Sequence, residues 1–146
     1  MTIFISYSQD SDRVRLLVRA LRRHGLRTWR DQDSLKQGAA TEDTIEEELE
    51  RCGTAMVWLG GNTLSSEFVC RNELPLIFQH HAARGMRIVP LFVDVDIHTG
   101  VDAIRSATGH EIGSHNGYRF DNAKPLDGHL TEVAECAHLI WPHLGG

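Results

Sequence analysis

The sequence predicts a three-layer α/β domain with a five-stranded parallel sheet at its centre. Short apolar segments of strand length alternate with segments whose apolar residues recur at helical spacing. Such alternation is typical of βαβ units, in which helices cover both faces of a parallel sheet. The chain has 146 residues and shows no repeat or linker, so we expect one domain over residues 1–146.

The elements can be placed in order along the chain. The expected strands are residues 2–6, 26–29, 54–59, 87–93 and 118–120. The first helix begins at Asp10 or Ser11 and stops at Gly25, and the others are expected over residues 41–52, around 74–81 and around 130–144. Residues 94–117 are polar and predict only one helical turn, near 101–106. Five such strands favour a flavodoxin-like sheet in the order 2-1-3-4-5.

This strand order predicts a ligand crevice. The chain reverses direction between strands 1 and 3, and ligands bind outside the carboxyl ends of the strands at such a point. The loops at those ends are residues 7–10 and 60–66, and Glu73 lies in the helix that follows the second loop. Pro75 suits a helix that begins near residues 72–74. Glu73 then either points from the first turn towards the crevice or is a surface glutamate that favours the helix dipole.

Glu73 also stands beside the apolar face of its helix. At about 100° per residue, Leu74, Ile77, Phe78 and His81 cluster on one side, and Glu73 falls at the edge of that cluster. We therefore expect its carboxylate to be partly removed from water.

Composition excludes several classes of protein. The net charge of −5 argues against nonspecific binding to nucleic acid or to anionic membranes. No apolar run approaches the length of a membrane span, and no signal peptide is visible, so a cytoplasmic location is expected. The three cysteines are unclustered, which favours a reducing compartment. The nine histidines lack ligand spacing with cysteines or carboxylates, so no metal site is expected.

Familiar catalytic motifs do not occur. The glycine patterns of dinucleotide-binding and P-loop proteins are missing, as is the nucleophile elbow of α/β-hydrolases. A response-regulator receiver shares the strand order, but it requires acidic residues after strand 1 and an aspartate at the end of strand 3. Tyr7-Ser8 and Gly60-Gly61 stand at those places.

Four motifs, in order, resemble those of TIR (Toll/interleukin-1 receptor homology) domains. They are Ile3-Phe4-Ile5-Ser6-Tyr7-Ser8; Trp29-Arg30-Asp31 with Leu35-Lys36-Gln37-Gly38; Ser65-Ser66 with Cys70-Arg71-Asn72-Glu73-Leu74; and Arg87-Ile88-Val89-Pro90-Leu91. The third is similar to the family signature S-x-W-C-x-x-E-L. The resemblance covers residues 1–93 well and the remainder only in its order of elements.

The resemblance implies an NAD+-cleaving enzyme of the bacterial type, with NAD+ as substrate and no cofactor. Glu73 aligns with the family's catalytic glutamate. The substrate contacts it implies are Tyr7, Ser8, Trp29, Asp31, Leu35, Lys36, Gly38 and Cys70. The loop over residues 33–40 would border the nicotinamide end, and in active relatives it closes on the pocket of a stacked neighbour. The resemblance thus implies self-assembly, an anti-phage immune role, and a fused or associated sensor domain.

Two positions depart from the family pattern. Val69 stands where the family usually has tryptophan, with Phe68 one position earlier, and Ala40 stands where one relative has a pocket aromatic. A non-enzymatic TIR–TIR interaction domain is therefore the alternative function.

Overall fold

The computed structural model describes residues 2–30, 42–60, 69–115, 117–121 and 123–140. One sheet is formed by β1 (Thr2–Ser6), β2 (Arg27–Arg30), β3 (Cys52–Leu59), β4 (Arg87–Phe92) and β5 (Tyr118–Arg119). Its order is β2-β1-β3-β4-β5 and its neighbouring strands are parallel, which confirms the predicted topology. β3 is buried along nearly its whole length, as expected for a central strand covered on both faces.

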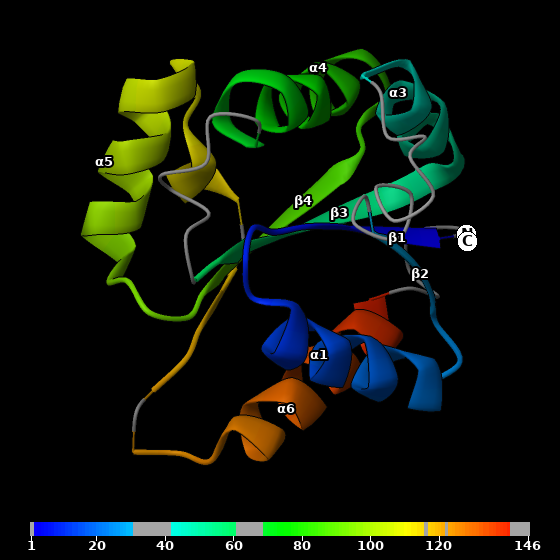
Figure 1. The fold of residues 1–146 in the computed structure, drawn as a ribbon, viewed down its shortest axis with the longest axis vertical. Helices are drawn as coiled ribbons and strands as arrows, with labels where there is room; N and C mark the ends of the chain where they lie inside the picture. The colour runs from blue at the N-terminus through cyan, green and yellow to red at the C-terminus, as the bar shows by residue number, and fades with distance from the viewer. Residues whose placement is uncertain (1, 31–41, 61–68, 116, 122, 141–146) are drawn as a thin grey trace.

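Helices cover both faces of the sheet (Figure 1). One face carries α1 (Ser11–Arg23) and α6 (Leu126–Ile140), and the other carries α3 (Glu42–Arg51), α4 (Leu74–Arg84) and α5 (Ile97–Thr108). Because side chains alternate along a strand, Ile3 and Ile5 pack towards α1 while Phe4 packs towards α3 and α4. The core therefore consists of two apolar clusters separated by the sheet.

Most predicted boundaries agree with the structure to within a few residues. α1 ends before Gly25, whose φ of 79° supplies the left-handed turn expected there. α3 ends at Arg51, so Cys52 begins β3 instead of closing the helix as predicted. Thr41 and the last part of the predicted closing helix, residues 141–144, lie outside the described residues.

The expectation for residues 94–117 is wrong. They contain α5, a helix of 12 residues, and a 3-10 turn, Ile112–Ser114. Asp96 caps α5 by accepting a hydrogen bond from the Thr99 backbone N–H at 2.8 Å. Only a narrow stripe of α5 is buried, centred on Gly100 and Ile104. The Phe92 ring lies against Gly100 and leaves no room for a side chain there. A buried position of α5 is therefore a glycine, and the apolar periodicity of the α5 sequence is weak.

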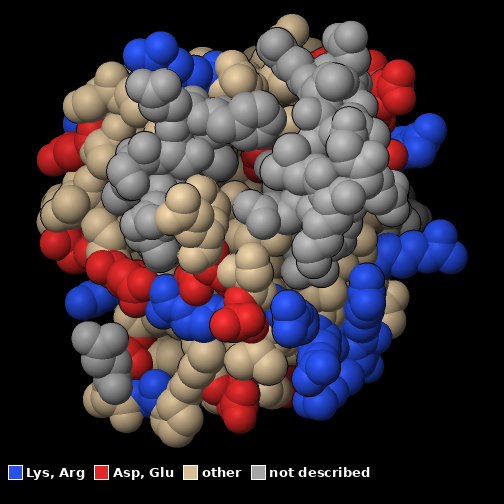
Figure 2. All heavy atoms as spheres, viewed as in Figure 1, with Lys and Arg blue, Asp and Glu red and all other residues tan. Residues whose placement is uncertain are grey.

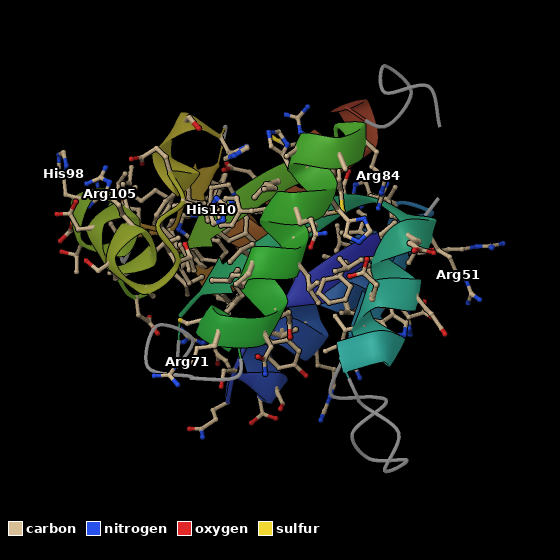
Figure 3. The ribbon with its side chains drawn as sticks, turned by 90° about the horizontal axis from the view of Figure 1, so that it is seen from above. Arg51, Arg71, Arg84, His98, Arg105 and His110 are labelled. Atoms are coloured by element: carbon tan, nitrogen blue, oxygen red, sulfur yellow. The ribbon has the colours of Figure 1, made fainter. Side chains whose placement is uncertain are left out.

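The inner face of α4 also differs from the prediction. His81 is exposed, whereas His80 is buried among polar partners. The Nε2 atom of His80 lies 3.0 Å from Glu46 of α3, and its Nδ1 accepts a hydrogen bond from Arg84 at 3.0 Å. Arg84 reaches towards α3 (Figure 3) and donates to the Cys52 carbonyl at 2.8 Å. The end of α4 thus faces α3 as well as the sheet.

β5 is short, and close contacts surround its start. Among the described residues, it pairs with β4 at Leu91 and Phe92. Pro90 precedes them and has no N–H to donate. Gly117 approaches Pro90 so closely that a Cβ atom at residue 117 would lie 2.4 Å from the Pro90 carbonyl oxygen. In the part of the chain that is described, no helix is both long and apolar enough to span a bilayer.

Candidate functional site

The ends of β1 and β3, where the crevice was predicted, lie at the same edge of the sheet, and most of the second predicted crevice loop, residues 61–66, lies outside the described residues. Ser6, the last residue of β1, pairs with Val57, so β3 extends two residues further along the same edge. Gly60 follows β3 and faces tightly packed neighbours: a Cβ atom there would lie 2.9 Å from both Trp58 Nε1 and Val93 Cβ. Glycine at this position lets the chain leave the strand without displacing the Trp58 ring.

Glu73 lies at a junction between two kinds of helix. Val69–Glu73 forms a π-helical turn, and α4 begins at Leu74 with Pro75 in its first turn, as predicted. The Glu73 backbone is already helical, with φ of −80° and ψ of −51°. π-Helical turns widen a helix by one residue and occur frequently at functional sites. Pro75 cannot donate to the turn before it, which favours this irregular start.

The Glu73 side chain is fully buried, at 0% exposure. The surface alternative for this glutamate is therefore wrong, and the burial is more complete than the helical projection predicted. Its chain neighbours Cys70 and Leu74 belong to the apolar cluster beneath α3, α4 and α5. Arg71, by contrast, is exposed and points outwards (Figure 3). The π-helical turn thus holds one carboxylate inside the fold.

Cys70, a predicted substrate contact, lies in the same π-helical turn as Glu73. It is 7% exposed, and burial raises the pKa of its thiol. A buried neutral thiol is a poor nucleophile, because the thiolate is the reactive form. Cys70 is consequently suited to shaping an apolar wall.

Trp29 and Tyr7 face opposite layers. Trp29 is half-buried and stacks on Phe4, with ring centroids 5.0 Å apart, on the same side of the sheet as Cys70. Tyr7 is 2% exposed and packs in the cluster beneath α1 and α6. Ser8 is half-buried in the following turn, where Gln9 has a positive φ of 55°. The structure therefore brings Trp29 and Cys70 into one layer and places Tyr7 in the other. Asp31, Leu35, Lys36 and Gly38 lie outside the described residues.

A polar network that the sequence analysis missed links three strand ends at this edge. The buried Trp58 indole donates to Asp10 at 2.5 Å, and Arg13 Nε donates to the same carboxylate at 2.8 Å. Arg13 also donates to Asp94, after β4, at 3.0 Å, and its guanidinium lies 5.9 Å from the Trp58 ring centroid. The Asp94 and Asp10 carboxylates raise the pKa of Arg13 above its ordinary value. The network fixes the turn after β1 against the ends of β3 and β4.

One signal for this network was present in the sequence. A tryptophan in a buried strand requires an acceptor for its N–H, and Asp10 follows the neighbouring strand. Asp10 was instead expected, as one of two candidates with Ser11, to cap the start of the first helix. It occupies the N-cap position of α1, but its side chain makes no capping hydrogen bond.

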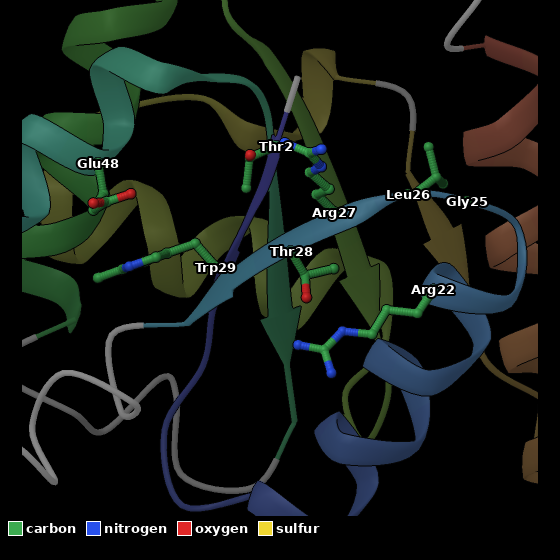
Figure 4. Close-up of a pocket in the computed structure, with 8 residues that line it drawn as sticks. All are labelled: Thr2, Arg22, Gly25, Leu26, Arg27, Thr28, Trp29 and Glu48. Atoms are coloured by element: carbon green, nitrogen blue, oxygen red, sulfur yellow. The ribbon is translucent and has the colours of Figure 1, made fainter.

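Two cavities lie near the sheet. One, of about 240 Å³, is lined by Val93, Asp94, Val95, Asp96, Arg119 and Phe120 at the ends of β4 and β5. The other, of about 560 Å³, follows β2 (Figure 4) and is lined by residues of α1, β2 and α3 and by Thr2. Neither was predicted, and neither is lined by Glu73. Within the described residues, no three His, Cys, Asp or Glu side chains are grouped so as to hold a metal ion.

A parallel α/β sheet in this order, with a carboxylate buried in the turn before α4, defines a flavodoxin-like domain with a candidate acidic site. The family model described as TIR domain matches residues 3–122, and the chain belongs to that family. No curated protein sequence matches this chain.

Two solved structures have the same fold. The TIR domains of the activated Roq1 resistosome that recognises the pathogen effector XopQ are 24% identical, with a TM-score of 0.59 over 92% of this chain and 83% of theirs. The RPS4 and RRS1 TIR domain heterodimer is 16% identical, with a TM-score of 0.62 over 95% of this chain and 97% of its own. At these identities the likeness concerns the fold.

Proposed function

We propose that this TIR domain cleaves the nicotinamide–ribose bond of NAD+ and that Glu73 is its catalytic residue. The observation that carries the proposal is the fully buried carboxylate at the π-helical turn before α4. By its resemblance to the family motif, Glu73 aligns with the family's catalytic glutamate, and the chain belongs to that family. Fold likeness alone would not support an activity, so the proposal depends on this residue.

The chemistry suits a single carboxylate. Cleavage of the N-glycosidic bond sends its electron pair to the nicotinamide ring, which is cationic in NAD+ and leaves as a neutral molecule without a general acid. Positive charge develops on the ribose, and a carboxylate held in a poorly hydrated site stabilises that charge strongly. Attack by water on the ribose carbon, with loss of a proton, gives ADP-ribose, whereas attack by another group of the same molecule gives a cyclic product.

The remaining contacts are proposals as well. Trp29 and Cys70 would form one wall of the substrate site, and Tyr7 and Ser8 would offer hydroxyl or backbone groups to ribose or phosphate. Asp31 would flank the pocket together with Trp29, and Leu35, Lys36 and Gly38 would border the nicotinamide end.

We further propose that assembly switches on the activity, in an anti-phage effector of the cytoplasm with a fused or associated sensor. This proposal is supported by the two solved relatives, a resistosome and a heterodimer, in which TIR domains of those proteins assemble.

Release of nicotinamide tests the activity. Concentrated protein with a crowding agent is incubated with NAD+, and products are separated by chromatography. We expect Glu73→Gln to lower the rate of nicotinamide release by roughly 100-fold or more, which is the effect expected when an electrostatic catalytic group is lost. Glu135→Gln, an exposed change on α6, is the matched control. Circular dichroism establishes that each variant is folded. Turnover by folded Glu73→Gln at the control rate contradicts the assignment of the site.

A non-enzymatic interaction domain is the second candidate. Val69, where the family usually has tryptophan, favours it because a stacking partner for the substrate is lost. Absence of nicotinamide release even in protein that has been driven into oligomers would support this function.

A further inference from the structure

A buried hydroxyl group lies at the carboxyl end of β1. It belongs to Ser6, the last residue of the strand, whose side chain is 0% exposed. Among the described residues, no group lies within hydrogen-bond distance of the Ser6 Oγ atom. Nearly all buried polar side chains in folded proteins are hydrogen-bonded, because burying an unpaired one is unfavourable. A hydroxyl kept in such a place is suited to a partner that arrives from outside the chain.

Ser6 faces the layer of the fold that contains Glu73. Side chains alternate along a strand, so Ser6 lies on the same side of the sheet as Phe4, and its register partner on β3 is Val57. Phe4 and Val57 belong to the apolar cluster beneath α3, α4 and α5. Leu74, which follows Glu73, belongs to the same cluster. The hydroxyl and the carboxylate are therefore buried on one face of the sheet.

Both groups also lie towards the carboxyl edge of the sheet. β1 ends at that edge with Ser6. α4 runs back to the start of β4, which is parallel to β3, so the first turn of α4 lies towards the same edge. Parallel α/β sheets bind their ligands at this edge.

Glu73 differs from the other acidic residues in its burial. Figure 2 shows Asp and Glu side chains spread over the molecular surface. Among the described residues, Glu73 is the one carboxylate that is buried. The layer thus encloses one hydroxyl and one carboxylate among apolar side chains.

A ribose can satisfy both groups at once. A serine hydroxyl can donate a hydrogen bond and accept others, whereas an ionised carboxylate only accepts. A ribose hydroxyl both donates and accepts, so one hydroxyl can donate to Glu73 while it or its neighbour accepts from Ser6. An apolar ligand would leave the Ser6 hydroxyl unpaired.

We propose that Ser6 binds a hydroxyl of the nicotinamide ribose of NAD+ and so holds this ribose against Glu73. The inference rests on the proposed function, which names NAD+ and Glu73. Ser6 forms no covalent bond in this role and transfers no proton; its hydrogen bond orients the ribose. Both groups are enclosed in the empty domain, so the substrate reaches them when the packing over this layer opens, as activation by assembly allows.

The first measurement is the stability of the domain without ligand. We expect Ser6→Ala to raise the midpoint of thermal unfolding by about 2–4 °C, because it removes a buried polar group that has gained no partner on folding. A lower midpoint would show that the hydroxyl already has a partner in the ligand-free domain, such as a buried water, and would overturn the proposal.

The second measurement is the affinity for NAD+. Equilibrium dialysis uses concentrated protein with a crowding agent, and every protein carries Glu73→Gln so that NAD+ is not consumed. We expect S6A/E73Q to bind NAD+ with a Kd roughly 10-fold higher than E73Q, as for loss of one hydrogen bond.

The matched control is T54V/E73Q. Thr54 is 5% exposed, and its register partner is Ile3 of the cluster beneath α1 and α6, so its hydroxyl lies on the other side of the sheet. This control should bind NAD+ as E73Q does. Equal affinities of S6A/E73Q and E73Q for NAD+ would overturn the proposal.

Two analogues locate the contact. One lacks the 2′-hydroxyl of the nicotinamide ribose and the other lacks the 3′-hydroxyl. For one of them Ser6→Ala should have no further effect on the Kd, because the partner of Ser6 is already missing. An equal loss of affinity for NAD+ and for both analogues would mean that Ser6 does not contact this ribose.

The outcomes separate this contact from the proposed activity. A natural chain that releases no nicotinamide but binds NAD+ through Ser6 would retain the contact and refute the activity. Nicotinamide release by the natural chain, with NAD+ affinity indifferent to Ser6→Ala, would retain the activity and refute the contact. A chain that neither binds nor cleaves NAD+ would refute both.

Discussion

At the scale of single residues, Asp10 shows how one carboxylate can organise a strand end. It accepts hydrogen bonds from the buried Trp58 indole and from Arg13. We expect Asp10→Ala to lower the free energy of unfolding by about 2 kcal/mol, because it leaves a buried donor without an acceptor. Urea unfolding followed by tryptophan fluorescence measures the change. Asp12→Ala, two residues later and exposed, is the control and should alter stability by a few tenths of a kcal/mol.

His115 provides a residue-scale prediction about pH. Burial, and secondarily the charge of His81, lowers its pKa below the ordinary value of 6.5. The rings of His81 and His115 meet edge to face with their centroids 4.6 Å apart, and the centroid of the Phe78 ring lies 6.2 Å from that of His115. Since the unfolded chain binds the proton at a higher pH than the folded one, stability falls as pH drops through 6.5 towards the folded pKa.

Replacing this histidine should therefore flatten the pH profile. We expect His115→Asn to lose less stability than the natural chain between about pH 7.5 and about pH 5. Urea unfolding at both values measures this, and His98→Asn, exposed on α5 (Figure 3), is the matched control. An unchanged pH profile in His115→Asn would refute the prediction.

At the scale of elements, α5 depends on a glycine. The Phe92 ring approaches Gly100 so closely that a Cβ atom would lie 2.9 Å from it. We expect Gly100→Val to cost about 2 kcal/mol of stability, because a buried ring has little room to move. Thermal unfolding of Gly100→Val against Ala107→Val, an exposed change on the same helix, checks it. Equal effects of the two changes would show that the contact with Phe92 is unimportant.

The predictability of the elements varied with how each buries its surface. β3 and β4 were predicted from continuous apolar runs, and α1 from its spacing and its glycine stop. α5 was missed because its sequence carries little apolar periodicity. Of its two buried residues, Gly100 has no side chain, which leaves Ile104 as the one buried apolar side chain among the described residues of the helix. Asp96 and Gly109, which cap its two ends, were the signals present in the sequence.

The candidate site was predictable in part. Strand order and Pro75 placed Glu73 before α4, but its full burial depends on packing among elements distant in the sequence. The same limitation hid the contact between Arg13 and Asp94, which are 81 residues apart.

At the scale of the whole molecule, that contact joins α1 to the segment after β4. We expect a double-mutant cycle with Arg13→Met and Asp94→Asn to give a coupling energy of about 0.5–1 kcal/mol, since the pair is partly exposed. Urea unfolding of the four proteins measures it. Additive effects of the two changes would mean that the pair does not stabilise the fold.

The contact between Pro90 and Gly117 bears on how the protein behaves in a crowded cell. It leaves β5 with two paired residues, so this end of the sheet offers almost no template to an incoming strand. The opposite end, at β2, is four residues long and flanked by charge. Both ends of the sheet thus carry features that disfavour pairing with a foreign strand: the shortness of β5 at one end and the exposed charge of Arg27 on β2 at the other.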